Sequence, residues 1–225
     1  MNELEILHDG IDFCLYRQPV SEFGVPVVIK KLKTHVPTPS LVFQLKNEWE
    51  QTHNLSLHGI RKAFKLDVSN GNTALYLEYV KGISLRQYFL TRQWDLKDIL
   101  QAGIQIAKIL SGIHSTGIIH KDVNPRNILV GDDLTHITLI DFGIATKLSV
   151  KTDYSITPDK LEGSLAYISP EQTGRMNRTV DSRTDLYSLG VTLYELLVRA
   201  LPFNAAEPIE FIYCHIASSP VAPHL

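Results

Sequence analysis

The 225-residue sequence has few of the residues that stabilise small secreted domains or anchor a chain in a membrane. Its two cysteines, Cys14 and Cys214, are far apart and in no metal-ligand spacing, so we expect neither a disulfide framework nor a cysteine-based zinc site. No stretch approaches ~18 uninterrupted apolar residues, so no membrane span is expected. The formal net charge of -2 gives no bulk electrostatic support for a nucleic-acid partner. Together these absences favour a cytoplasmic protein in a reducing compartment.

The first 80 residues are patterned mainly as strands. Apolar and polar residues alternate from Leu4 to Leu15, with a turn predicted at residues 8–10. Three β-rich runs follow at 25–32, 63–68 and 74–80, the last two joined by an Asn-Gly turn at 70–72. Between them, residues 40–55 carry apolar side chains at helical spacing. The predicted order is therefore β-β-β-α-β-β.

After Lys81-Gly82 the pattern changes to helices, which places a domain boundary between residues 80 and 81. A short hairpin is predicted at 128–140, and the polar stretch 149–162 is expected to be a mobile loop. Helices are predicted over 85–90, 95–115, 185–198 and 207–217.

Residues 120–127 read HKDVNPRN, which matches the catalytic-loop pattern H-R-D-x-x-x-x-N. Chemistry at such a loop needs an aspartate that faces an attacking hydroxyl, here Asp122. It also needs an asparagine five residues later that reaches a metal ion, here Asn127. Pro125 between them helps to fix the loop. These residues are therefore candidates for catalysis.

Two further segments fit the same chemistry. Residues 141–143 read DFG directly after a predicted strand, and the carboxylate of Asp141 would hold Mg²⁺ against nucleotide phosphates. Residues 27–30 read VVIK, close to V-A-I-K, so the ammonium of Lys30 would grip the phosphates and pair with a helix glutamate. The spacing leaves Glu48 and Glu50 both open as that partner. Each segment alone is a weak signal, but their order and separation indicate a single mechanism.

With these three segments in place, the chain resembles the eukaryotic-type protein kinase superfamily, in particular the Ser/Thr kinases, over nearly its whole length. The resemblance implies an α+β, bilobal fold. Residues 1–80 would form a small five-stranded antiparallel N-lobe with one helix, which binds nucleotide. Residues 81–225 would form a larger, mainly helical C-lobe with the catalytic loop and activation segment, incomplete at its C-terminal end.

Other segments extend this resemblance. Residues 75–80, LYLEYV, resemble the hinge, with Leu77 as gatekeeper and the backbone of Glu78 and Val80 facing adenine. Residues 163–171, GSLAYISPE, resemble the loop on which a protein substrate docks. Asp185 resembles the buried aspartate that braces the catalytic loop.

The resemblance implies transfer of the γ-phosphoryl group of ATP to Ser or Thr hydroxyls of a protein substrate, with Mg²⁺ as cofactor. Asp122 would orient the hydroxyl and accept its proton, while Asn127 and Asp141 would hold Mg²⁺. Lys30 would hold the phosphates, paired with Glu48.

Residues 170–178, PEQTGRMNR, resemble the kinase domain at the head of large bacterial multi-domain sensor proteins. In those proteins an ATPase-like region, sensor modules and a histidine kinase follow, so we expect further domains of a longer chain as partners.

Two departures from the family pattern favour an alternative, a pseudokinase that acts as an ATP-binding or scaffolding regulatory module. Only Gly10 stands where a G-x-G-x-x-G loop is expected, and Asn124 replaces a lysine that touches the transferred phosphate. A third departure, Lys121 in place of an arginine, makes control by phosphorylation of the activation loop less expected. The intact catalytic set counts against this alternative. A small-molecule kinase, which shares the H-x-D-x-x-x-x-N loop, leaves the docking segment 163–171 unexplained.

Overall fold

The structure is a computed structural model that describes residues 4–34, 37–69, 72–148 and 163–223. The predicted loop at 149–162 and the centre of the predicted turn at 70–71 lie outside the described residues. The chain divides into two compact units: unit 1 comprises Met1–Lys81 and Ile140–Gly143, and unit 2 comprises Gly82–Leu139 and Ile144–Leu225. The predicted boundary between 80 and 81 assigns 140–143 to the second domain instead. These residues belong to unit 1 because they contact its helix and its central strand.

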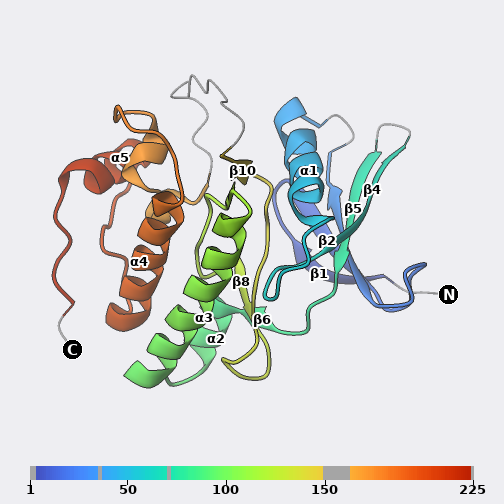
Figure 1. Ribbon diagram of the computed structural model, residues 1–225, viewed down its shortest axis with the longest axis horizontal. Helices are drawn as coiled ribbons and strands as arrows, with labels where there is room; N and C mark the ends of the chain where they lie inside the picture. The colour runs from blue at the N-terminus through green and yellow to red at the C-terminus, as the bar shows by residue number, and fades with distance from the viewer. Residues whose placement is uncertain (1–3, 35–36, 70–71, 149–162, 224–225) are drawn as a thin grey trace. The chain divides into compact units, whose positions relative to one another are not determined.

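Unit 1 is a five-stranded antiparallel sheet with one helix, α1, packed against β4 and β5 (Figure 1). The strand order is β1-β2-β3-β5-β4, which confirms the predicted α+β class and the five strands of the small domain. The elements are β1 (Glu5–Asp9), β2 (Phe13–Gln18), β3 (Val27–Leu32), α1 (Pro39–Thr52), β4 (Ala63–Ser69) and β5 (Asn72–Glu78). The first turn begins at Gly10, later than predicted, because His8 and Asp9 still pair with β2.

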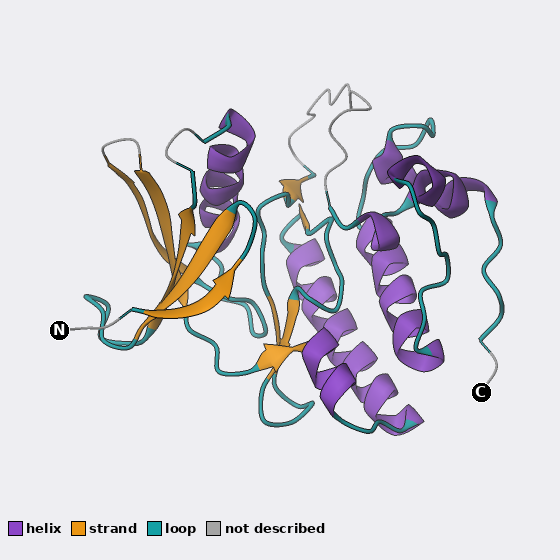
Figure 2. Cartoon of the chain, turned by 180° about the vertical axis from the view of Figure 1, so that it is seen from behind, coloured by secondary structure: helices purple, strands orange, loops and turns teal. Residues whose placement is uncertain are grey.

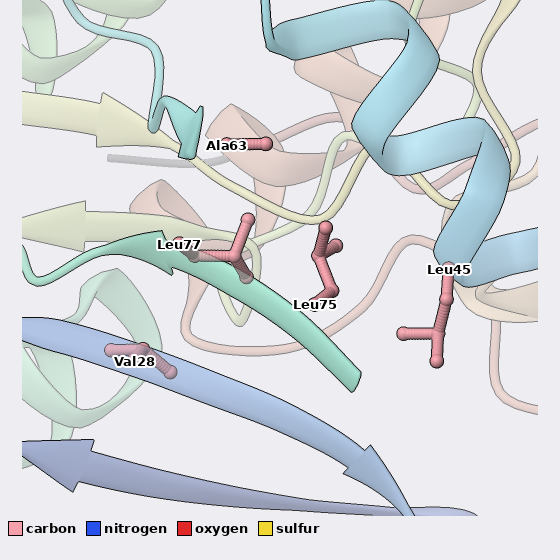
Figure 3. Packing of buried hydrophobic residues seen from close by; sticks show 5 residues of the cluster. All are labelled: Val28, Leu45, Ala63, Leu75 and Leu77. Carbon is pink, nitrogen blue, oxygen red and sulfur yellow. The ribbon is translucent and has the colours of Figure 1, made fainter. Parts of the chain in front are cut away.

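Alternation along β3 separates the two faces of the sheet. Successive side chains of a strand point to opposite faces, so Val28 joins the cluster that α1 covers, while Val27 and Ile29 pack on the other face. The covered cluster comprises Val28, Leu45, Ala63, Leu75 and Leu77 (Figure 3). Lys30, two residues after Val28, therefore points to the same side as α1.

The start of α1 follows from its sequence. The Thr38 side chain accepts a hydrogen bond from the backbone N–H of Leu41, and Pro39 fits the first turn because its fixed φ suits a helix. Leu45 is fully buried, and Glu48, one turn later on the same face, is buried with it.

Unit 2 is mainly helical, with two short sheets (Figure 2). The long helix α3 begins at a capping box formed by Asp95 and Asp98, and it packs along α4 (Figures 1 and 2). The predicted hairpin is the antiparallel pair β8–β9. The elements are β6 (Ile83–Ser84), α2 (Leu85–Thr91), α3 (Leu96–Ser115), β7 (Ile118–Ile119), β8 (Ile128–Val130), β9 (Ile137–Leu139), β10 (Thr146–Lys147), α4 (Arg183–Val198), α5 (Pro208–Ala217) and the 3-10 turns η1 (Leu165–Tyr167) and η2 (Pro170–Thr173).

Of the helices in the described part of the chain, none has the length and apolar character that a membrane span requires.

Candidate functional site

The centre of the site in unit 1 is the ammonium group of Lys30 on β3. It donates to Glu48 Oε2 at 2.8 Å and to Asp141 Oδ1 at 2.9 Å. Burial pushes the pKa of Lys30 down, but the carboxylates of Asp141 and Glu48 outweigh it and leave the pKa raised. The ammonium is therefore protonated at neutral pH, and it joins three segments that are far apart in sequence.

The register of α1 decides between the two glutamates that the sequence left open. Glu48 is 1% exposed and pairs with Lys30, whereas Glu50 is exposed. The helical period explains why Glu48 is buried and Glu50 is exposed. Glu48 lies one turn after the buried Leu45 on the same face of α1, and Glu50 does not.

Glu48 has a second cationic partner that sequence reasoning missed. The guanidinium Nη2 of Arg61, just before β4, lies 3.2 Å from Glu48 Oε1, and both side chains are almost fully buried. No local pattern marks Arg61, since the neighbouring Lys62 is exposed and the two are chemically alike in the sequence.

The D-F-G segment is held against α1. Asn47 donates its side-chain N–H to the carbonyl oxygens of Phe142 at 3.3 Å and Gly143 at 3.0 Å. The Phe142 ring is buried, while the side chain of Asp141 keeps 41% exposure. Asp141 also has a φ of 66°, a left-handed conformation that aspartate tolerates better than most residues. Asn47 was not predicted, because an asparagine inside a helix carries no signal for a distant carbonyl.

The three predicted hinge residues lie at the end of β5 and just beyond it. Leu77 is fully buried in the cluster under α1. The backbone N–H of Glu78 donates to the carbonyl of Lys62 at 2.8 Å, so any contact from Glu78 to adenine has to use its carbonyl oxygen. Val80 lies just beyond the strand, outside regular structure.

The turn between β1 and β2 replaces the glycine-rich loop that the family pattern requires. Gly10 N–H donates to Phe13 O at 3.0 Å, and a Cβ at Gly10 would lie only 3.0 Å from that same oxygen. The side chain of Lys33 stabilises the turn, because its ammonium donates to the carbonyl oxygen of Gly10 and forms an ion pair with Asp9. The Phe13 ring lies 4.9 Å from Lys30 Nζ, so an aromatic face covers the ammonium where glycine backbone is absent.

In unit 2 the carboxylate of Asp122 is oriented by three donors. Asn127 Nδ2 donates to Oδ2 at 2.7 Å, while Ser164 N–H at 2.8 Å and Asn124 Nδ2 at 3.1 Å donate to Oδ1. The predicted pair Asp122 and Asn127 is thus in direct contact. Because Asn127 uses its amide nitrogen here, its amide oxygen is the atom suited to a metal ion.

Asn124, which replaces the expected lysine, is a buried member of this network. Its Nδ2 also lies 3.2 Å from Ser164 Oγ, and its Oδ1 accepts from the backbone N–H of Arg126 at 2.9 Å. The side chain is 1% exposed. It links the catalytic loop to the segment that resembles the docking loop, and it does so without a charge.

Asp185 of α4 braces the catalytic loop, as the resemblance implied. Its carboxylate accepts from the backbone N–H groups of His120 at 2.9 Å and Lys121 at 2.8 Å, and it contacts His114 Nε2 at 2.8 Å. It is fully buried. Lys121 has a φ of 70°, and its carbonyl accepts from Gln172 Nε2 at 2.8 Å. A lysine in this conformation costs about 1–2 kcal/mol, so these contacts keep the backbone in a strained shape.

A cage of several metal ligands is not present among the described residues, where no three His, Cys, Asp or Glu side chains gather. Mg²⁺ is usually held by one or two carboxylates together with substrate phosphates and water. The half-exposed carboxylate of Asp141 and the amide oxygen of Asn127 are oxygen donors of the type that Mg²⁺ requires. The donor chemistry therefore fits this ion.

Comparison with known proteins gives a consistent match. The family model described as "Protein kinase domain" matches residues 16–219. A probable serine/threonine-protein kinase of Clostridium acetobutylicum is 32% identical over 200 residues, which covers 88% of this chain and 30% of that protein.

Two other bacterial relatives are similar to the same region. Serine/threonine-protein kinase PknB of Mycolicibacterium smegmatis is 32% identical over 207 residues, covering 88% of this chain and 32% of PknB. Serine/threonine-protein kinase pkn3 of Myxococcus xanthus is 33% identical over 162 residues, covering 68% of this chain and 29% of pkn3. The chain thus spans about a third of the length of the curated relatives it matches.

Proposed function

The chain belongs to the protein kinase domain family, and we propose that it transfers the γ-phosphoryl group of ATP to serine or threonine hydroxyls of a protein. The observation that carries this proposal is the buried ammonium of Lys30, shared between Glu48 and Asp141. A buried lysine with two carboxylate partners, one of them half exposed, is suited to receive phosphate oxygens. The names of the bacterial relatives support Ser/Thr specificity.

Unit 1 contributes phosphate binding. Glu48 fixes the Lys30 side chain, so its ammonium is already oriented when the nucleotide arrives and needs little reorganisation during reaction. Because Lys30 is desolvated, its charge acts more strongly on phosphoryl oxygens than an exposed lysine would. The carbonyl of Glu78 and the backbone of Val80 would recognise adenine.

Unit 2 contributes the group that handles the proton. Asp122 orients the substrate hydroxyl, whose oxygen bonds to the γ-phosphorus as the bond from phosphorus to the β–γ bridging oxygen breaks. ADP leaves, and the hydroxyl proton passes to an oxygen of Asp122 late in the transfer. Asn127, Asn124 and Ser164 hold that carboxylate in place, so positioning rather than covalent chemistry supplies the rate.

Mg²⁺, when bound, neutralises charge on the phosphate oxygens. Asp141 and the amide oxygen of Asn127 would hold it.

The pseudokinase alternative is not favoured. Lys30, Asp122, Asn127 and Asp141 are all present, and each has the polar partners that its role requires. The missing glycines next to Gly10 and the neutral Asn124 are the features that speak for a binding module. The Phe13 ring over Lys30 offers a substitute for the missing glycines. The hydrogen bond from Asn124 to Asp122 offers a substitute for the missing lysine.

The proposed setting is a bacterial signalling protein in the cytoplasm, where ATP is available. A protein substrate would dock on the segment from Gly163 to Glu171. The sequence of 170–178 supports further domains of the multi-domain sensor type (ATPase-like, sensor and histidine kinase) in the whole protein, and this remains a prediction.

Incubation of the chain with γ-labelled ATP, Mg²⁺ and a generic Ser/Thr substrate tests the proposal, with Asp122→Asn as the matched control. We expect label on serine or threonine from the wild-type chain and a loss of several orders of magnitude in the variant. Equal labelling by both proteins would remove Asp122 from the mechanism. Tight Mg·ATP binding by a folded wild-type chain with no transfer to any hydroxyl would support the pseudokinase instead.

A further inference from the structure

Each of the two carboxylate oxygens of Glu48 contacts a different cation. Oε2 accepts from Lys30 at 2.8 Å, and Oε1 lies 3.2 Å from Arg61 Nη2. All three side chains are at most 6% exposed. Glu48 is therefore held through both of its carboxylate oxygens, and rotation of its side chain would break at least one of two buried ion pairs.

The two cations differ in their other contacts. The ammonium of Lys30 contacts both Glu48 and the half-exposed Asp141, and a metal ion would also attract the carboxylate of Asp141. Arg61, in the segment before β4, contacts the other carboxylate oxygen of Glu48. Glu48 thus keeps a compensating charge even while Lys30 turns toward a phosphate.

Stability alone does not explain an arginine at this place. Within the described part of the chain, Arg61 Nε is buried and has no hydrogen-bond partner. An unpaired buried N–H is destabilising, and buried ion pairs often add less stability than an apolar side chain of similar volume. Glu48 would still have Lys30 if residue 61 were apolar.

We propose that Arg61 is a positioning residue: it holds Glu48 in the orientation that keeps Lys30 directed at the nucleotide phosphates. The inference rests on the proposed kinase function. In this proposal Arg61 is a second cation bound to Glu48 of α1. Arg61 contacts neither nucleotide nor substrate, and it acts only through Glu48 and Lys30.

The kinetic test compares R61M, R61K and the control K65M in the full chain. Lys65 lies on the neighbouring β4 in an exposed pair with Glu22, so K65M removes a cation from the same region without touching the site. For R61M we expect kcat to fall by roughly 10- to 100-fold, because a small misplacement of a catalytic group has effects of this size. KM for ATP should change by less than about 3-fold, and R61K should recover most of kcat.

A purely structural role gives a different result. R61M would then lower the melting temperature but leave kcat of the folded chain, measured well below that temperature, equal to that of K65M. This result would overturn the proposal. Failure of R61K to recover any activity would also count against it, since the charge is the property assigned to residue 61.

A second arm needs no activity. K30M is introduced into the wild-type chain and into R61M, and melting temperatures are compared. Glu48 keeps one cation in each single variant, but in the double variant it is buried without compensation, so we expect an extra loss of roughly 10 °C beyond additivity. Additive shifts would show that the two cations do not share Glu48. If the wild-type chain transfers no phosphoryl group, the proposed function fails, and this arm alone decides whether Arg61 holds Glu48.

Discussion

Replacing Asp185 with alanine should loosen the catalytic loop more than any exposed carboxylate change in unit 2. Asp185 is fully buried and accepts from two backbone N–H groups, those of His120 and Lys121. Alanine removes the carboxylate that accepts from both donors. It also removes one of the contacts that keep Lys121 at its left-handed φ of 70°.

The size of the effect can be worked out from these contacts. Each N–H that loses the carboxylate costs about 1–3 kcal/mol, and return of Lys121 to a relaxed conformation offsets about 1–2 kcal/mol. For the two N–H groups the net loss in the free energy of unfolding is therefore about 0–5 kcal/mol, with a midpoint of about 2.5 kcal/mol. For a chain of this size the midpoint corresponds to a fall in melting temperature of roughly 5–10 °C. The strained loop shape is lost even if the fold survives.

Urea unfolding and amide hydrogen exchange check this reasoning. The matched control is Asp181→Ala, which removes an aspartate whose partner, Arg183, is exposed and lies at the start of the same helix. We expect the control to cost less than about 1 kcal/mol. Native protection of the His120 and Lys121 amides in Asp185→Ala, with stability equal to the control, would refute the bracing role of Asp185.

Three further predictions concern single residues. Asn124→Ala should lower kcat by roughly 10- to 100-fold with little change in KM for ATP, because it frees Asp122 from one donor; steady-state kinetics showing an unchanged kcat would contradict this. Asp141→Ala should abolish metal-dependent nucleotide binding without unfolding the chain; calorimetry that finds normal Mg·ATP binding would exclude its metal role. Burial lowers the pKa of His215, so the unfolded chain binds its proton more readily. Stability should be full above about pH 6.5 and fall as the pH drops toward the lowered pKa, by at most about 1.4 kcal/mol per pH unit. His215→Gln should flatten this acid loss in melting curves at several pH values, and an identical pH profile would rule out His215 as its source.

Local patterns explain why much of unit 1 could be predicted. Alternation along β3 places Lys30 on the face of Val28, and the VVIK motif that contains it indicates its chemistry. Such features depend on neighbours within a few residues, so the sequence contains them. The choice between Glu48 and Glu50 stayed open because it depends on the register of α1, which the burial of Leu45 fixes in the structure.

Long-range partners could not be predicted in this way. Arg61 reads as one more basic residue beside Lys62, and only the packing of its segment against α1 shows that it is buried on Glu48. Asn47 is likewise an ordinary helix residue until the D-F-G segment lies against it. The two-residue strands β6, β7 and β10 were also missed, because two residues are too few to show a period.

The membership of Ile140–Gly143 in unit 1 has a consequence for recombination between genes and for protein engineering. A gene fragment for residues 1–81 would encode the whole sheet and α1, yet it would lack Asp141, the second carboxylate on Lys30. A fragment for the remainder would carry Asp141 without the lysine. Recombination at the apparent boundary therefore produces two pieces that each lose the charge balance around Lys30, and a functional exchange has to transfer both stretches of sequence together.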